Sequence, residues 1–224
     1  MGTLTVAEMQ TEIRGNMGGR TDLNARHLTW INFVQDMIAR QYDFPEMDET
    51  AESTLTASQA TITIATRPRA VYSFRIINAS QSARLTYIPN AQWDTLIPYP
   101  EDFSEAQPTH YTYWDNKFEF WRVPDAAYEY KMRWRKYPTV LTATTEKSDY
   151  DRKDDIIVCF ATSWGFKSIG DTERMNYWGN HAWNQLKGAI KSESRKPDKH
   201  IVPISEIKEL VGQPWLDPFT VSDR

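Results

Sequence analysis

The sequence has few of the residues that build redox, metal or membrane sites. One cysteine, Cys159, among 224 residues excludes an internal disulfide and a cysteine-based zinc site. The four histidines are scattered, and none has another histidine three or four residues away, as a helical metal pair requires. No apolar run approaches the ~20 residues of a membrane span. The polar N-terminal residues, which include Glu8, do not resemble a signal peptide. We therefore expect no cofactor, no metal and no membrane contact, and a place in the cytosol or in a particle assembled there.

Motifs of catalysis are missing as well. The sequence has no Gly-x-Ser-x-Gly elbow. Its glycine cluster, Gly15–Arg20, lacks the Lys-Ser/Thr ending of a phosphate loop and follows a helical pattern rather than a strand. Carboxylate pairs such as Asp154-Asp155 have the positions expected of a helix N-terminus. The sequence therefore predicts a protein that is not an enzyme.

Charge and aromatic content narrow the kinds of partner. The net charge is −4 and the pI is about 5.6, so contact with nucleic acid would need a local basic patch. Nine Trp, eleven Tyr and nine Phe make up 13% of the chain. Aromatic side chains dominate both cores and interfaces, and two interpretations stay open: a tryptophan-rich core, or a surface that faces partners.

Helical patterns occupy both ends of the folded part. Thr5 and Glu8 form a capping box that starts a first helix, which ends at Gly18-Gly19. We expect Asp22 to cap a second helix with one apolar stripe facing the core and a second stripe of Trp30, Phe33 and Met37. Two further helices, broken at Gly170-Asp171, follow residue 151. Since each stripe needs a partner, residues 1–47 and 151–194 are expected to form one bundle of about four helices.

Residues 48–137 change to a period of two, with β-branched and aromatic residues alternating with polar ones, which indicates strands, and residues 48–150 are expected to form the β-rich insertion. Turn signals at Asp115-Asn116 and at Pro124–Ala127 predict hairpins. We expect Asn90 to cap a short helix through Leu96, which interrupts the pattern. The predicted fold is therefore α+β: a helical bundle with an inserted antiparallel β-sheet region.

One strand of this insertion has a cationic side. In residues 128–137, one face is apolar and the other carries Lys131, Arg133 and Arg135. A solvated outer face is one interpretation. The other is a stripe that meets DNA phosphates or an acidic partner.

The last part of the chain, residues 195–224, combines prolines with apolar residues. The prolines prevent a long helix, whereas a disordered tail would have fewer apolar side chains. We expect an extended docking arm. Its expected contacts with a partner are Ile201, Val202, Ile207, Leu210, Trp215, Leu216 and Phe219. The alternative is that the arm folds back over Trp30, Phe33 and Met37.

The order of these segments resembles the head-to-tail adaptor proteins of tailed bacteriophages, also called head completion or connector proteins. The resemblance covers about residues 3–190 and rests on pattern and order. Its segments are Gly18–Asp22, Trp30–Asn32, Tyr42–Glu46, Pro108–Thr112, Asn116–Trp121, Pro124–Tyr128, Arg133–Pro138 and Ile169–Arg174.

The resemblance implies a structural virion protein at the head–tail junction, assembled in the host cytoplasm. Such adaptors form a ring, usually of twelve copies, below the portal protein. They extend the DNA channel, help to retain packaged DNA without reading its sequence, and dock tail or neck proteins. Two alternatives stay open: another phage neck or tail component, such as a stopper or tail-tube protein, or a small hydrolase with a non-standard site.

Overall fold

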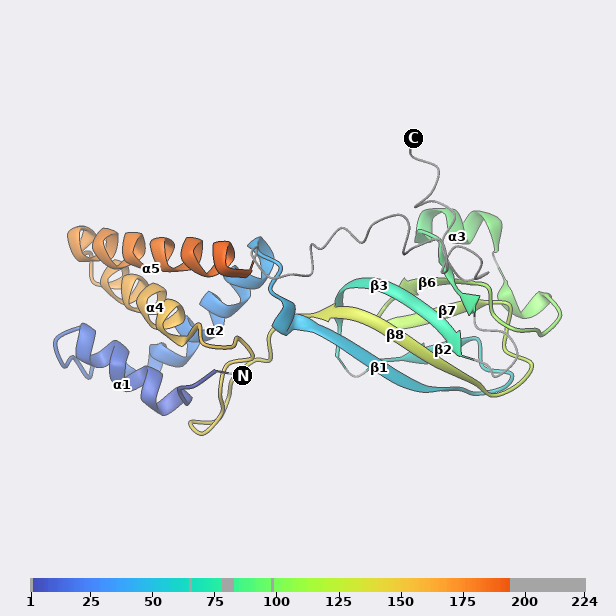
Figure 1. Ribbon diagram of the computed structural model, residues 1–224, viewed down its shortest axis with the longest axis horizontal. Coiled ribbons are helices and arrows are strands. Elements are labelled where there is room, and N and C mark those ends of the chain that lie inside the picture. The colour runs from blue at the N-terminus through green and yellow to red at the C-terminus, as the bar shows by residue number, and fades with distance from the viewer. Residues whose placement is uncertain (1, 65, 78–82, 98, 194–224) are drawn as a thin grey trace, which may run out of the picture. The chain divides into compact units, whose positions relative to one another are not determined.

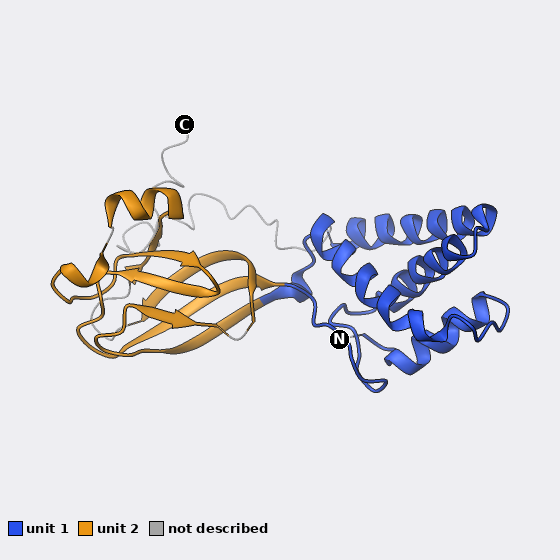
Figure 2. Cartoon of the chain, turned by 180° about the vertical axis from the view of Figure 1, so that it is seen from behind, with its two compact units in different colours: residues 1–48, 137–199 blue, residues 49–136, 200–224 orange. Residues whose placement is uncertain are grey.

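The structure is a computed structural model that describes residues 2–64, 66–77, 83–97 and 99–193. The chain is α+β, with five α-helices and two β-sheets among these residues. It divides into two compact units (Figure 2). The described part of the helical unit comprises residues 2–48 and 137–193, and the β unit comprises residues 49–136.

Four helices build the helical unit: α1 (Val6–Asn16), α2 (Asn24–Gln41), α4 (Asp154–Ser168) and α5 (Thr172–Glu193) (Figure 1). Helix α4 is the most buried of them, and it contacts α1, α2 and α5. Its Gly165 permits close packing, because a Cβ there would lie 2.5 Å from the Met17 sulfur and 3.2 Å from the Trp30 ring. The short 3-10 helix η1 (Pro45–Met47) follows α2.

The start of α1 and the turn after α4 follow local sequence signals, whereas the start of α2 does not. The capping box is confirmed, because the Thr5 hydroxyl accepts from the Glu8 N–H and the Glu8 carboxylate accepts from the Thr5 N–H. The turn between α4 and α5 uses Gly170 at φ +78°, a conformation that favours glycine. The expected Asp22 cap is wrong: α2 begins at Asn24, and Asp22 pairs with Arg20 instead.

The segment 137–150 belongs to the helical unit and not to the inserted β region, where it was expected. Two polar side chains of α2 hold it there. The Asn32 side chain bonds the N–H and the C=O of Leu141, and buried Gln35 accepts from the Ser148 hydroxyl at 2.8 Å. The Tyr150 hydroxyl donates to the Gln35 carbonyl. These long-range polar contacts leave no trace in the periodicity of the sequence.

The β unit contains two four-stranded sheets. The first has the order β1-β8-β3-β4 and the second has the order β2-β7-β6-β5. Their bounds are β1 Asp48–Leu55, β2 Thr61–Thr63, β3 Pro68–Ile77, β4 Ala83–Arg84, β5 Thr86–Tyr87, β6 His110–Trp114, β7 Lys117–Trp121 and β8 Tyr128–Lys136.

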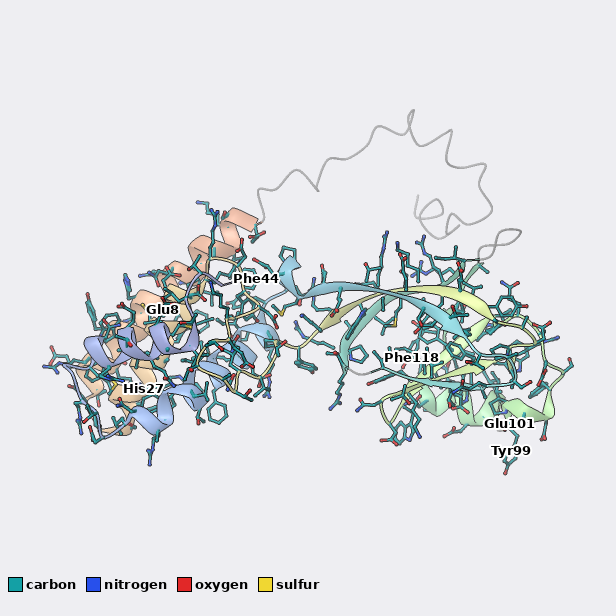
Figure 3. All side chains as sticks on the ribbon, turned by 90° about the horizontal axis from the view of Figure 1, so that it is seen from below. Glu8, His27, Phe44, Tyr99, Glu101 and Phe118 are labelled. Carbon is teal, nitrogen blue, oxygen red and sulfur yellow. The ribbon has the colours of Figure 1, made fainter. Side chains whose placement is uncertain are left out.

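The two sheets pack face to face around an aromatic core. The Phe74 ring, from the first sheet, lies 5.5 Å from Tyr111, 5.7 Å from Phe118 and 5.3 Å from Phe120, all from the second sheet. Figure 3 labels Phe118 in the space between the sheets. The β unit is therefore a sandwich, whose two outer faces carry the remaining side chains of the alternating pattern.

Two expectations for the β region are corrected. The hairpin at Asp115-Asn116 is present, with β6 and β7 antiparallel. The hairpin at Pro124–Ala127 is wrong, because β7 and β8 lie in different sheets and that turn crosses between them. The region is also not purely antiparallel, since β5 runs parallel to β6. Alternation along a strand identifies its two faces but not the sheet to which it belongs.

A short helix, α3 (Asn90–Leu96), and the 3-10 helix η2 (Pro100–Asp102) lie over the outer side of the second sheet. The Asn90 side chain donates to the Tyr113 carbonyl and accepts from the Thr112 hydroxyl, and Trp93 is buried beneath the helix. The expected cap at Asn90 is wrong, because Pro89 holds that position.

Candidate interaction surfaces

The expected docking residues of the arm, Ile201, Val202, Ile207, Leu210, Trp215, Leu216 and Phe219, lie outside the described residues. The other expected site, the stripe on β8, is described in full. The candidate surfaces among the described residues belong to the β unit and to the helical unit, each taken by itself.

Lys131, Arg133 and Arg135 lie on the outer face of the first sheet, as the alternation predicts, while Met132 and Trp134 are buried in the sandwich core. Two of the three cations already have contacts within the β unit. Lys131 forms an ion pair with Glu52 of β1. The Arg135 guanidinium lies over the Tyr72 ring, 5.3 Å from its centroid, and is only 8% exposed. Arg133 is exposed and makes no ion pair with any described residue.

The structure adds two arginines that the sequence pattern did not single out. Arg75 of β3 lies directly opposite Lys131 on one side and opposite Arg84 of β4 on the other. Three like charges thus face one another across three strands. Together with Arg133 and Arg135 they form what we call the cationic face: Arg75, Arg84, Lys131, Arg133 and Arg135. Cross-strand register, which the sequence does not reveal, creates this face.

The outer side of the second sheet is acidic. Residues 88–109 contain four acidic residues and no Lys or Arg. Asp94 and Glu101, both exposed, lie near Glu119 of β7. Burial, together with the charges of Glu101 and Asp94, raises the pKa of the Glu119 carboxyl. We call Asp94, Glu101, Asp102 and Glu119 the acidic surface.

Exposed apolar side chains accompany these acids. Leu96 and Tyr99 are 64% and 65% exposed, and Phe103 packs its ring edge-on against Trp121 at 5.9 Å. Figure 3 shows Tyr99 and Glu101 at the periphery of the β unit, on the side of α3 and away from β1 and β8. Acidic and aromatic groups side by side are suited to bind arginine, which pairs with carboxylates and stacks on rings.

At the tip of the β6–β7 hairpin, an open pocket of about 480 Å³ is lined by Arg67, Tyr113, Trp114, Asp115 and Asn116. The Trp114 side chain is 68% exposed. The Tyr113 hydroxyl donates to the Asn116 side chain across the turn. This tip is a second place on the β unit where an aromatic residue faces solvent.

In the helical unit, the second stripe of α2 is not the uniform surface that the sequence suggested. Trp30 is buried against α4, whereas Phe33 is 54% exposed and touches the Trp164 ring at 5.7 Å. On α5, Tyr177 is 66% exposed and stacks on His181. Some tryptophans are therefore core residues, while other aromatic rings face solvent.

A buried cation lies at the chain segments that precede the β unit and the arm. Lys153 is 5% exposed and forms ion pairs with Glu46, which follows α2, and with Glu193, the last residue of α5, at 3.8 Å. Its ammonium also lies 4.5 Å from the centroid of the Phe44 ring. Lys153 thus joins the segment after α2 to the end of α5. Removing Lys153 would leave the two carboxylates without their counter-charge.

The described residues offer no group of three His, Cys, Asp or Glu side chains arranged to hold a metal ion. Within the same ranges, no helix has the length and apolarity needed to cross a membrane. Cys159 is buried, and burial, with a smaller contribution from Asp155, raises the pKa of its thiol to about 11. The Cys159 side chain therefore packs in the core of the helical unit.

Comparison with known proteins gives one family. No curated protein matches the chain. A family model described as SU10 adaptor protein matches residues 4–195, which include nearly all of both units. The family is that of a structural adaptor protein of a phage, which implies a role other than catalysis. The chain, whose two units and α+β fold are described above, belongs to the SU10 adaptor protein family.

Proposed function

We propose that the chain forms an adaptor ring between the portal and the tail of the virion, extends the DNA channel, helps to retain packaged DNA and docks the tail. The observation that carries the proposal is the family match over residues 4–195. Because it spans the helical unit and the β unit together, it concerns the whole described architecture rather than one common module.

The proposed contact with the portal is the arm, residues 195–224. Its prolines preset an extended backbone, which lowers the entropy lost on docking. Trp215, Leu216 and Phe219 are the proposed anchors, since buried aromatic side chains carry much of the energy of an interface. Ile201, Val202, Ile207 and Leu210 would supply further apolar contacts.

Assembly with purified portal particles tests this proposal. The full chain is mixed with portal, and light scattering coupled to gel filtration measures the mass of adaptor bound per portal. We expect many copies per portal for the full chain and none for a chain truncated after Lys196. The paired variant Trp215→Ala/Phe219→Ala should lose binding, while Thr220→Ala/Ser222→Ala, changed in the same arm, should keep it.

Circular dichroism of each variant gives the necessary control. The truncated chain should keep the helical content and the melting temperature of the full chain. If truncation unfolds the helical unit, the arm folds back onto its own chain, and the proposed portal contact is wrong. If the truncated chain binds portal as well as the full chain, the arm is not the contact either.

A further inference from the structure

The two outer faces of the β sandwich carry opposite charge. Strands β3, β4 and β8 contain seven Lys or Arg residues and one acidic residue, and β1 of the same sheet adds Asp48, Glu49 and Glu52. Residues 88–109, over the other sheet, contain four acidic residues and no basic one. Over residues 49–136 the ten basic and ten acidic residues cancel. The β unit therefore has no net charge, while basic residues are concentrated on one outer face and acidic residues on the other.

The cationic face is electrostatically unfavourable in an isolated chain. Arg75 lies between Arg84 and Lys131 in direct cross-strand register, and like charges in that position destabilise a sheet. Glu52 compensates Lys131. Arg75 and Arg133, both exposed, have no ion pair with any described residue. A partner that brings carboxylates to these two arginines would remove the repulsion.

The acidic surface also contains like charges that repel one another, here of negative sign. Glu119 is half-buried with Glu101 and Asp94 close by, and the mutual repulsion of the three carboxyl groups contributes to the raised pKa of Glu119. Exposed Tyr99 and Phe103 stand beside them. Arginines from outside would pair with the carboxylates and stack on the rings.

We propose that the cationic face of one copy docks on the acidic surface of the next copy. The inference rests on the proposed ring, and it names the contact between neighbouring subunits. Since the two surfaces lie on opposite outer faces of one sandwich, the contact is head-to-tail, and each copy uses both surfaces. Contacts of this kind generate rings when the rotation closes.

A second copy fits the cationic face better than DNA does. Glu52 and Glu129 lie on the same side of the sheet as the arginines, and both would repel phosphates. The carboxylates required by Arg75 and Arg133 are present in the same chain, mainly in the segment 88–109, which contains no Lys or Arg. Charge complementarity of this kind specifies the partner and the register of an interface.

Charge reversal tests the contact, with portal particles as the assembly platform. Three variants are compared with the wild-type chain: Arg75→Glu/Arg133→Glu, Asp94→Lys/Glu101→Lys, and the chain with all four changes. The control is Arg67→Glu, an exposed charge reversal before β3 in the same unit and outside both defined surfaces. Light scattering gives the adaptor concentration at which half of the subunits on the portal are assembled.

We expect each paired variant to raise that concentration by about tenfold or more, and the control to leave it within about threefold of wild type. The chain with all four changes restores opposite charges across the contact, so it should assemble within about threefold of wild type. It should not mix into wild-type rings. Salt of about 0.5 M should weaken wild-type assembly, because it screens exposed charges.

Assembly of both paired variants at the wild-type concentration overturns the inference while leaving the ring intact. Failure of the fourfold variant to assemble, with an unchanged melting temperature, overturns it as well. A duplex DNA of about 30 base pairs serves as the second probe. If Arg75→Glu/Arg133→Glu assembles normally and loses duplex binding, DNA is the occupant and the inference is wrong. If the wild-type chain never binds the portal in several copies, the proposed function fails, and the inference fails with it.

Discussion

The side-chain amide of Asn32 bonds both backbone groups of Leu141: its Nδ2 donates to the Leu141 carbonyl at 2.9 Å, and its Oδ1 accepts from the Leu141 N–H at 2.9 Å. One side chain thus bonds both the N–H and the C=O of a residue far along the chain, as a neighbouring strand would do. Together with Gln35 it fastens the segment that leads back from the β unit to α4.

Replacing Asn32 with alanine should destabilise the helical unit by about 2 kcal/mol, since two bonds of about 1 kcal/mol each are lost and the Leu141 groups lose their partners. Urea unfolding followed by circular dichroism measures the change. Asn180→Ala, an exposed asparagine of α5, is the control and should stay within about 0.5 kcal/mol of wild type. Equal stability of both variants would contradict a structural role for the Asn32 clamp.

His27 should make the helical unit sensitive to mild acid. The ring is 1% exposed and packs against Trp30, and burial, with the charge of Arg14, lowers its pKa. The folded chain therefore binds this proton less readily than the unfolded chain does. Stability is complete above the unfolded pKa of about 6.5 and falls as the pH drops below it.

The measurement is urea unfolding at about pH 7.5 and pH 5.5. His27→Leu should show a smaller loss of stability between these pH values than the wild-type chain. His181→Leu changes an exposed histidine of α5 and should keep the wild-type dependence. If His27→Leu loses as much stability in acid as wild type, another group causes the effect.

The single cysteine should be unreactive in the folded chain. With its pKa raised to about 11 and a side chain in the core of the helical unit, Cys159 has almost no thiolate near neutral pH. We expect maleimide labelling to be slow in buffer and complete in urea, as followed by mass spectrometry. Thr29→Cys, at an exposed position of α2, should add one site that labels at once. Rapid labelling of Cys159 without denaturant would show that α4 opens readily.

Phe74 should be the most sensitive position of the β unit. Its ring contacts Tyr111, Phe118, Phe120 and Tyr130. Truncation to alanine leaves a cavity between the sheets, and the expected cost is about 3–5 kcal/mol. Near-ultraviolet circular dichroism and thermal melting report the loss. Tyr87→Ala, at a half-exposed edge position, should cost far less.

Local signals in the sequence predicted much of the helical unit. A capping box, a glycine at positive φ and apolar residues at helical spacing depend only on neighbours within a few residues, so Thr5, Glu8 and Gly170 were correctly interpreted. Asp22 was not, because an ion pair with Arg20 competes with capping. The residues 137–150 have no such period, and contacts with distant parts of the chain position them: the side chains of Asn32 and Gln35, and backbone bonds from Gly2, Val6 and Ala7.

The candidate site shows the same division between local and distant information. The alternation of β8 identified the outward cations correctly, since side chains alternate between faces. It could not identify Arg75 and Arg84 as their neighbours, because cross-strand register is set by the whole sheet. The turn at Pro124–Ala127 was misread for a related reason: a short connection can join strands of one sheet or cross to another.

The chain enters the β unit along β1 and leaves it along β8, and these two strands are neighbours in one sheet. A module joined to its host through adjacent strands closes a short gap, so its presence adds little entropic cost to the folding of the flanking helices. Gene segments that encode such modules can be lengthened, exchanged or recombined during evolution while the surrounding helices keep their packing. In this chain, both connections of the β unit run through neighbouring strands, so a module of a different size could be joined to the same helices.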